Sequence, residues 1–569
     1  MNMNREPKKI YKDTREVSNF KEMLDTTVKL YGNNIAYKYK ETVTDNTYIQ
    51  KTYNDVKENV RKLSTALLDL GLNEKRVVVI GKNRYEWCIT YFSVTTGGMV
   101  VVPLDKMLPE NEISNLVKRS GASAIFFDKQ YIEIMKKIKK DSENNVELLI
   151  CMDDISDKEV KTFNELTKYG EGLLDKGDKR YDTVDIDKDK MSIMLFTSGT
   201  TNLPKAVMLS HYNICSNINM LASWVLIRSD DRLLSFLPIH HTFECTITFL
   251  FGFFSGATVC FCDGLKYIQK NLVEYKISVF VAVPLILETM YKKILKGIDE
   301  KGKTKLIKTM TKISNALLKI KIDIRKKLFK QVIDNFGGHL RVIFYGAASM
   351  DKDTILGYTS FGLNLIQGYG ATETSPVIAA ETDKEKRPGS VGFVFDNLDV
   401  KIENKNTEGI GEIVVKGPSI MKGYYNNPEE TNKALKDGWY YTGDYGYIDE
   451  KGFLFITGRK KDIIVLRNGE NIYPQELEFL INKIPGVKES LVYQRKKDKT
   501  DTMLCAKIVY DPEIITEGDP YDIIWNQVKE INKTLPNFKF IKNISVTTTE
   551  FSKTTTQKVK RFEELKTVE

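Results

Sequence analysis

The stretch SIMLFTSGTTNLPK, Ser192 to Lys205, decides the fold, because a short apolar run leads directly into a loop of small, hydroxyl-bearing residues. Such residues let backbone N–H groups curl around phosphate oxygens, and Lys205 supplies a positive charge to a terminal phosphate. The loop is not the GxxxxGK[ST] loop of NTPases, and turns rich in Ser, Thr and Gly are common by chance. Alone, the stretch therefore indicates a phosphate loop after a buried strand and no more.

Similar apolar runs, bounded by Gly, Pro or Asp, recur on both sides of this stretch. They are VVVIG at Val77, AIFF at Ala124, LLICM at Leu148, ISVFVAV at Ile277 and LRVIFYG at Leu340. Helical patterns separate these runs, and strands that alternate with helices predict stacked α/β units with mainly parallel sheets. We therefore predict the α/β fold class for a large N-terminal domain.

The pattern changes twice towards the C-terminus. From Asp399, short strands and turns predict a small antiparallel β subdomain. After Gly458 the charged stretch GRKKD leads into an α+β pattern of about 110 residues, which is enough for an independent domain. We expect an N-terminal domain of residues 1–458 and a small mobile α+β domain of residues 459–569. The basic segment Lys296 to Phe336 predicts one or two amphipathic helices, interpreted as surface scaffold with solvated faces.

The composition excludes several classes of protein. The 569 residues exceed what one core supports, and 42% hydrophobic with 28% charged residues is typical of folded soluble chains. Lys and Arg outnumber Asp and Glu by 85 to 76, but the lysines are scattered, so nucleic-acid binding ranks last. Seven widely spaced cysteines imply no disulfide framework, and the four histidines lack zinc-site spacing. The N-terminus has no signal-peptide core, which predicts a cytoplasmic location.

Further motifs follow at intervals along the chain. GYGATETS offers Thr372 and Glu373, a hydroxyl and a carboxylate of the kind that holds Mg²⁺ against nucleotide phosphates. WYYTGD ends in Asp444, whose two acceptor oxygens suit ribose hydroxyls. GRKKDIIVLRNGENIYPQELE begins at Gly458, and FSKTTTQKVKR contains Lys558. An isolated TGD is usually a turn and a single lysine is usually solvated, so the argument depends on the order of the whole set.

In this order and spacing, the motifs resemble those of the AMP-forming acyl-CoA synthetases, which belong to the adenylate-forming superfamily. The resemblance covers nearly the whole chain, from Thr27 to Arg561. It implies that ATP, Mg²⁺ and coenzyme A bind, with Thr200 and Glu373 supporting the metal. The implied cofactor-binding residues are Thr197, Ser198, Gly199, Thr200, Thr201, Lys205, Gly346, Ala347, Gln367, Gly368, Tyr369, Gly370, Ala371, Thr372, Asp444, Arg459 and Lys461.

The resemblance also implies a role for each group. Gly346, Ala347 and the stretch Gln367 to Ala371 would line the adenine, while Asp444 and Arg459 would hold the ribose. Lys461 matches the hinge about which the family's C-terminal domain swings. Lys558 matches the lysine that bridges the substrate carboxylate and the α-phosphate. The implied catalytic residues are Lys558, Lys205, Glu373 and His241.

Two positions depart from the family pattern. Asn202 stands where the phosphate loop usually has Gly, and Gln557 stands where Gly usually precedes the catalytic lysine. Gly at such sites permits a positive φ or close backbone approach. Asn tolerates the left-handed conformation better than most residues, so Asn202 is expected to be harmless. Gln557 directly precedes Lys558, so its backbone conformation affects how the lysine side chain is positioned.

The motif PIHHTFE, Pro238 to Glu244, bears on the acid that is activated. In the family the position of His241 lies at the mouth of the acyl pocket, and Phe243 with Glu244 resembles the long-chain fatty acid branch. The resemblance thus implies that a fatty acid, or another carboxylic acid, becomes acyl-AMP and then acyl-CoA. Two alternatives stay open: transfer to a carrier protein in trans, and a catalytically weak nucleotide- or fatty-acid-binding protein. Acyl length, peripheral membrane contact and oligomeric state stay open too.

Overall fold

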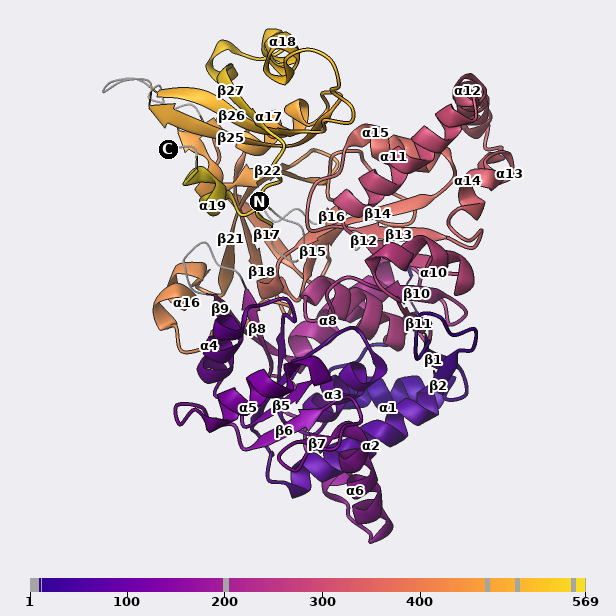
Figure 1. Ribbon diagram of the computed structural model, residues 1–569, viewed down its shortest axis with the longest axis vertical. Coiled ribbons are helices and arrows are strands. Elements are labelled where there is room, and N and C mark those ends of the chain that lie inside the picture. Colours follow the sequence, from indigo (N-terminus) through magenta and orange to yellow (C-terminus); the bar gives the residue numbers. More distant parts are fainter. Residues whose placement is uncertain are drawn as a thin grey trace. The chain divides into compact units, whose positions relative to one another are not determined.

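The computed structural model describes residues 10–11, 13–197, 204–465, 471–496, 502–553 and 559–567 (Figure 1). The chain forms two units. The first comprises Met1–Asp399 and Val415–Tyr440, and the second comprises Val400–Val414 and Tyr441–Glu569. The sequence predicts a domain boundary between residues 458 and 459, with a hinge near Lys461 about which the C-terminal domain moves. A division of the chain into two units does not test such a movement. It stays a prediction.

An eight-stranded sheet lies in the first unit, and the apolar runs predicted at Val77, Ala124 and Leu148 and before the phosphate loop form four of its strands. Its order is β19-β9-β8-β4-β3-β5-β6-β7, in which β4, β3, β5, β6 and β7 are parallel neighbours while β8 and β9 form an antiparallel hairpin. The strand bounds are β3 (Arg76–Ile80), β4 (Val100–Leu104), β5 (Ala124–Phe127), β6 (Leu148–Cys151), β7 (Lys161–Thr162), β8 (Met191–Thr197), β9 (Lys205–Ser210) and β19 (Gly423–Tyr424).

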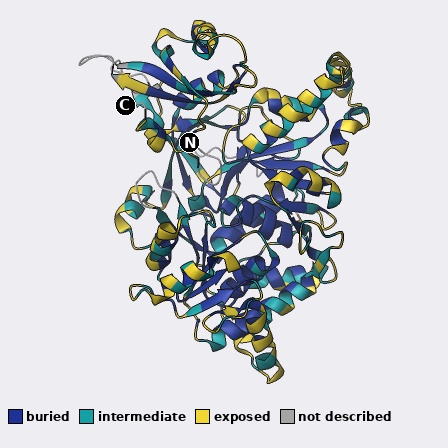
Figure 2. Ribbon diagram, in the orientation of Figure 1, coloured by how far each residue is buried: buried dark blue, intermediate teal, exposed yellow. Residues whose placement is uncertain are grey.

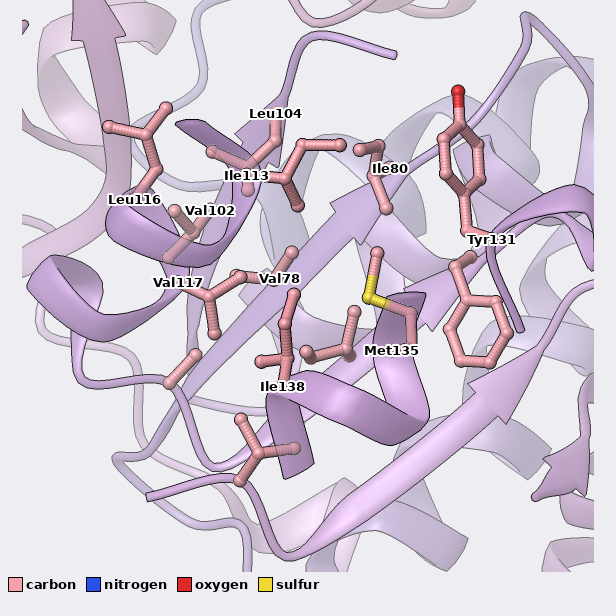
Figure 3. Packing of buried hydrophobic residues seen from close by; sticks show 14 of the residues in the cluster. Val78, Ile80, Val102, Leu104, Ile113, Leu116, Val117, Tyr131, Met135 and Ile138 are labelled. Atoms are coloured by element: carbon pink, nitrogen blue, oxygen red, sulfur yellow. The ribbon is translucent and has the colours of Figure 1, made fainter. Parts of the chain in front are cut away.

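Helices α4 (Glu110–Ser120) and α5 (Ile132–Lys140) cover one face of this sheet. Figure 3 shows their aliphatic side chains, among them Ile113 and Ile138, packed onto Val78 and Val102 of the central strands. Successive strand residues point to opposite faces, so Val78 and Ile80 share this face. The central strands are buried on both faces, which explains why they appear in the sequence as continuous apolar runs.

A nine-stranded sheet forms the rest of the first unit's framework, in the order β16-β15-β14-β13-β12-β10-β11-β1-β2. Strands β11, β10, β12, β13 and β14 are parallel, and β15 and β16 continue the sheet in antiparallel pairs. The bounds are β1 (Ile35–Tyr39), β2 (Ile49–Thr52), β10 (Arg232–Ser235), β11 (Thr258–Phe261), β12 (Val279–Ala282), β13 (Val342–Tyr345), β14 (Asn364–Gly370), β15 (Val377–Ala380) and β16 (Phe393–Val394).

The segment predicted as amphipathic helix is helical and lies on the surface of the first unit. The segment Lys296 to Phe336 contains the end of α11 (Pro284–Glu300) and all of α12 (Thr304–Lys319), and two short helices follow, α13 (Arg325–Leu328) and α14 (Lys330–Asp334). Figure 2 shows exposed residues along α12 and around α13, at the upper right of the view. The longer remaining helices of this unit are α1 (Phe20–Tyr31), α2 (Tyr53–Asp69), α3 (Tyr85–Thr96), α6 (Phe163–Asp175), α8 (His211–Trp224), α10 (Ile268–Glu274), α15 (Lys352–Ser360) and α16 (Pro428–Ala434).

The second unit has an antiparallel β part and an α+β part, as the change in sequence pattern predicts. Strand β17 (Asp399–Glu403), β18 (Gly411–Lys416) and the hairpin of β21 (Trp439–Ile448) with β22 (Leu454–Arg459) supply the first. The second is a three-stranded sheet of β25 (Val487–Lys496), β26 (Thr502–Tyr510) and β27 (Ile541–Thr547), contacted by α17 (Pro474–Ile481) and α18 (Pro520–Lys533). The predicted fold class is therefore confirmed.

Candidate active site

The predicted phosphate loop joins the two strands of the β8–β9 hairpin. Thr197 and Lys205 are direct partners across that hairpin, and the Thr197 hydroxyl donates to the Lys205 carbonyl at 3.4 Å. The antiparallel register thus fixes the two ends of the loop beside each other. Ser198, Gly199, Thr200, Thr201 and Asn202 lie outside the described residues.

Lys205 has two partners that the sequence did not reveal. Its ammonium group forms an ion pair with Glu430 and lies 5.0 Å from the centre of the Tyr424 ring. Both partners arrive through β19, which pairs with β9 and places Tyr424 opposite Val207. Asn427 then caps helix α16 by accepting from the Glu430 N–H at 3.1 Å, which fixes the carboxylate one turn into the helix.

Tyr424 also joins Lys205 to Glu373. The Tyr424 hydroxyl donates to Oε1 of Glu373 at 2.9 Å, and the Glu373 carbonyl accepts from the Met421 N–H at 2.9 Å. Burial raises the pKa of Tyr424 well above its ordinary value, and the negative charge of Glu373 raises it further, so the phenol stays a donor. The structure therefore brings Lys205, Tyr424 and Glu373 together, and Tyr424 contacts both charged groups.

The donor set at Glu373 fits a hard divalent cation. Oxygen Oε1 accepts from Tyr424, whereas Oε2 has no hydrogen-bond partner among the described residues. Thr372 precedes Glu373 in the 3₁₀ turn Thr372–Thr374, and its hydroxyl lies 3.4 Å from that of Thr242. Carboxylate and hydroxyl oxygens are the ligands that Mg²⁺ prefers. The second expected metal residue, Thr200, is outside the described residues.

The residues expected around adenine gather where β13 and β14 end. These strands are parallel, so Gly346 and Ala347 emerge beside Gln367 and Gly368. A Cβ atom at Gly346 would lie 2.8 Å from the Gly368 carbonyl oxygen, so only Gly fits there. Ala347 has φ of 70°, a left-handed conformation that costs a non-Gly residue about 1–3 kcal/mol. The backbone is thus shaped for close approach of a ligand.

Hydrogen bonds hold this edge of β14 in place. The Tyr345 hydroxyl donates to Oε1 of Gln367 at 3.0 Å, and the Gln367 N–H donates to the Glu381 carboxylate at 3.0 Å. Beyond Tyr369, a Cβ atom at Gly370 would lie only 1.8 Å from the Pro376 carbonyl oxygen. That same carbonyl accepts from the Ala371 N–H at 3.0 Å. Gly370 therefore allows the turn that places Thr372 and Glu373.

His241 begins the turn that leads to Thr242 and Phe243. Its Nδ1 accepts from the Phe243 N–H at 3.2 Å, so a neutral His241 carries its proton on Nε2. The Phe243 ring is 3.7 Å from the position that a Cβ of Gly346 would take. With the contact between Thr242 and Thr372, the motif PIHHTFE therefore lies against both Gly346, at the end of β13, and the Glu373 turn.

Glu244, the last residue of PIHHTFE, is completely buried and has no ionic partner among the described residues. Its carboxyl group accepts from the Ser235 hydroxyl at 2.7 Å and from the Thr248 hydroxyl at 2.9 Å. Burial raises the pKa of Glu244 from 4.5 to about 8, although these hydroxyls and the Phe236 backbone lower it. At neutral pH it is therefore a protonated acid at the start of the π-helical segment Glu244–Phe251. Such segments occur often at functional sites.

The second unit carries the residues expected at the ribose. Asp444 and Arg459 are direct partners across the β21–β22 hairpin, with Nε of Arg459 3.0 Å from Oδ1 of Asp444. The Asp444 side chain is only 6% exposed, so the pairing compensates for removing its charge from water. Lys461 is exposed in the short 3₁₀ turn Lys460–Asp462 that follows β22. Gln557 and Lys558 lie outside the described residues.

The first unit thus combines two mainly parallel sheets with a lysine-bearing hairpin beside the Glu373 turn, and the second unit contains an α+β part. This combination is the class of fold that the resemblance to adenylate-forming enzymes implies. The AMP-binding enzyme family matches residues 24–425, and the AMP-binding enzyme C-terminal domain matches residues 461–567. The chain therefore belongs to the AMP-binding enzyme family. The resemblance to the AMP-forming acyl-CoA synthetases is confirmed.

Relatives and solved structures agree with this assignment. The chain is 26% identical over 567 residues to the long-chain-fatty-acid–CoA ligase FadD15 of Mycobacterium bovis, with 92% of each chain covered. It is 29% identical over 510 residues to the long-chain-fatty-acid–CoA ligase 6 of Mus musculus, covering 85% of this chain and 72% of that one. ATP-bound MatB from Rhodopseudomonas palustris shares the fold with a TM-score of 0.75 at 22% identity, covering 96% and 99% of the two chains.

Proposed function

We propose that this protein is an AMP-forming fatty acid–CoA ligase. It converts a fatty acid and ATP into acyl-AMP and pyrophosphate, and then transfers the acyl group to coenzyme A. The observation that carries the proposal is that the chain matches both domains of the AMP-binding enzymes. In addition, the two long-chain-fatty-acid–CoA ligases described above are similar to this chain over most of their length.

The charged groups of the first unit suit the triphosphate of ATP. A carboxylate is a weak nucleophile, and the negative triphosphate repels it, so catalysis depends on positioning and charge compensation. Lys205 places one positive charge at the end of the phosphate loop, and ATP exchanges that lysine's contact with Glu430 for contact with a phosphate. The left-handed turn at Ala347 and the close approach of Gly346 to Gly368 leave backbone groups for adenine.

Glu373 and Thr200 would hold Mg²⁺, which when bound compensates phosphate charge. Tyr424 keeps the Glu373 carboxylate oriented by donating to one of its oxygens. In the second unit, Asp444 has the two acceptor oxygens that a pair of ribose hydroxyls requires. Arg459 pairs with one of these oxygens, Oδ1, and so keeps the carboxylate in place. Lys558 would bridge the fatty acid carboxylate and the α-phosphate.

The two chemical steps need different groups around one intermediate. First, the carboxylate oxygen bonds to the α-phosphorus as the bond to pyrophosphate breaks. The coenzyme A sulfur then bonds to the acyl carbonyl carbon, loses its proton, and AMP leaves. Rotation of the C-terminal domain about Lys461 would exchange the groups between the steps and shield the mixed anhydride from water. We propose a cytoplasmic site of action. Among the described residues, no helix is long and apolar enough to cross a membrane.

The test is AMP formation by the purified protein with ATP and Mg²⁺, across saturated acids from acetate to stearate, each with and without coenzyme A. Turnover that requires coenzyme A and rises with chain length is expected. Acyl-AMP that accumulates and is never consumed by coenzyme A would instead point to a carrier protein as acceptor. Absence of acid-dependent AMP with every chain length would overturn the proposal.

A further inference from the structure

Helix α12 presents an apolar row and a basic row to solvent. Three Lys-aliphatic pairs recur at intervals of seven residues: Lys305–Leu306, Lys312–Ile313 and Lys319–Ile320. Residues seven apart lie on the same side of a helix, and Ile320 is the cap residue that directly follows α12. Leu306, Ile313 and Ile320 are 55%, 51% and 65% exposed, which is unusual for three large aliphatic side chains in a single row.

These aliphatic side chains are not needed to attach α12 to the fold. A different face of the helix does that, since Ile307 and Met310 pack against the core of the nine-stranded sheet and Ser314 is buried. The exposed row lies beside that packed face, and the helices with the most extensive contact to α12 are α11 and α15. The row is therefore a second apolar surface in addition to the one that folding uses.

The net charge of the chain is concentrated around this row. Residues 284–334 contain 14 Lys or Arg and 5 Asp or Glu, a net charge of +9, which equals the net charge of the whole chain. Residues 301–322 contain seven lysines and no acidic residue. Lys305, Lys312 and Lys319 form no ion pair with any residue that the structure describes. Elsewhere, positive and negative charges balance.

We propose that α12 and the turn to Ile322 are a docking surface for an anionic lipid bilayer. The three aliphatic side chains enter the boundary between head groups and acyl chains, and the lysines contact the lipid phosphates. A helix with one aliphatic row and flanking lysines binds in this manner, and surface attraction by anionic lipid adds to burial of the apolar row. The docking surface is independent of the proposed function, because none of its residues belongs to the nucleotide or acyl site.

Charge and composition favour lipid over the other possible occupants. A second copy of residues 301–322 would bring seven lysines against seven lysines with no acidic residue to compensate them, which opposes self-association. Nucleic acid is usually bound by basic surfaces that include aromatic side chains for base stacking, and residues 301–322 contain no aromatic residue. An anionic bilayer satisfies both the lysines and the aliphatic row.

Vesicle sedimentation of the full-length protein tests the proposal. The probes are vesicles of phosphatidylcholine alone and vesicles with about one third phosphatidylglycerol. One variant replaces Lys305, Lys312 and Lys319 with Gln, and another replaces Leu306, Ile313 and Ile320 with Ser. The matched control replaces Lys139, Lys140 and Lys168, exposed lysines of α5 and α6, with Gln. Thermal unfolding and AMP formation with soluble octanoate show that each variant is folded.

We expect the wild type and the control to bind only the anionic vesicles. The lysine variant should bind at least tenfold more weakly, since each lysine near an anionic surface contributes roughly fivefold. The aliphatic variant should also lose at least tenfold. Equal binding by all four proteins, binding to pure phosphatidylcholine as strong as to anionic vesicles, or lipid-free dimers that the aliphatic variant abolishes would each overturn the proposal. Failure here leaves AMP formation untouched, so the two proposals fail separately.

Discussion

The first unit uses lysine in two contrasting ways. Lys205 lies at the end of a strand, half-enclosed, with Glu430 as ionic partner and the Tyr424 ring beside it. The lysines of α12 are exposed, have no ionic partner among the described residues, and lie next to exposed aliphatic side chains. The first arrangement holds one charge in a fixed place, whereas the second spreads charge over a surface.

This difference suggests what each region recognises. A fixed lysine whose partner can be exchanged suits one phosphate group of a bound nucleotide, because little reorganisation is needed when the ligand arrives. Mobile lysines on flexible stems suit an array of phosphates without a fixed geometry. If the comparison is right, changes in one region should leave the function of the other intact.

Replacement of Lys205 by Ala should have the largest effect. Loss of a preorganised charge at the triphosphate should lower kcat/KM for ATP on the order of 10²–10³-fold with a soluble acid such as octanoate. Vesicle binding should not change. Steady-state AMP formation measures the first outcome and sedimentation the second.

The matched control is Lys312→Gln, which removes a charge from α12 and should leave turnover of octanoate within twofold. Thermal unfolding should separate a catalytic effect from misfolding, because Glu430 is partly solvated and tolerates the loss of its partner. A fall in kcat/KM of less than about fivefold in Lys205→Ala would contradict the assignment of Lys205 to the triphosphate.

Glu244 sharpens the comparison, because it is an ionisable residue that is completely buried and has no ionic partner in the part of the chain that the structure describes. Its pKa is raised to about 8, so the folded protein keeps a proton that the unfolded chain loses near 4.5. The free energy of unfolding should therefore fall as pH rises from about 4.5 to 8, by up to about 1.4 kcal/mol per pH unit, and level off above pH 8. Glu244→Gln mimics the protonated acid and lacks this fall.

Urea unfolding of the wild type and Glu244→Gln at pH 5, 6.5 and 8 measures that difference. The stability of the variant relative to the wild type should increase with pH across this window. Glu300→Gln, at the exposed end of α11, is the control and should show no such trend. A constant difference at all three pH values would mean that Glu244 is ionised in the folded protein.

Tyr424→Phe keeps the ring beside Lys205 and removes only the hydroxyl that contacts Glu373. A hydrogen bond to a charged group typically contributes about 1.5–3 kcal/mol, and Tyr424 is only 5% exposed, so water replaces little of it in the variant. We expect roughly a tenfold increase in the Mg²⁺ concentration that half-saturates AMP formation. Tyr425→Phe, on the neighbouring residue, is the control. An unchanged Mg²⁺ requirement would show that Tyr424 does not orient the metal-binding carboxylate.

The sequence was informative where structure is local. Apolar runs such as VVVIG form β3 because a strand buried on both faces needs apolar residues at successive positions. The loop before Lys205 could be located because the hydroxyl-rich pattern directly follows such a strand. The residues that the resemblance placed around adenine do come together at the ends of β13 and β14. Their roles remain predictions.

The sequence was silent where contacts depend on distant pairing. Tyr424 and Glu430 reach Lys205 only because β19 pairs with β9 across more than two hundred residues, and GYYNNPEE contains no chemical pattern that predicts it. The exposed apolar row on α12 could not be predicted from the sequence for another reason. Its periodicity predicts an amphipathic helix, but a sequence with two adjacent apolar stripes does not tell which one packs and which stays exposed.

Glu430→Gln should have the smallest effect and is the most direct test of the exchangeable pair. In the absence of ATP, Glu430 pairs with Lys205, so it competes with an incoming phosphate for that lysine. Lys205 is also the main reason that the pKa of Glu430 is lowered. Removal of the negative charge should therefore lower KM for ATP by about two- to fivefold, in line with a partly exposed ion pair, with little change in kcat. Glu429→Gln, one residue earlier and exposed, is the control. A higher KM in Glu430→Gln would instead show that Glu430 positions Lys205 for the nucleotide, and the pair would then be a fixed part of the site.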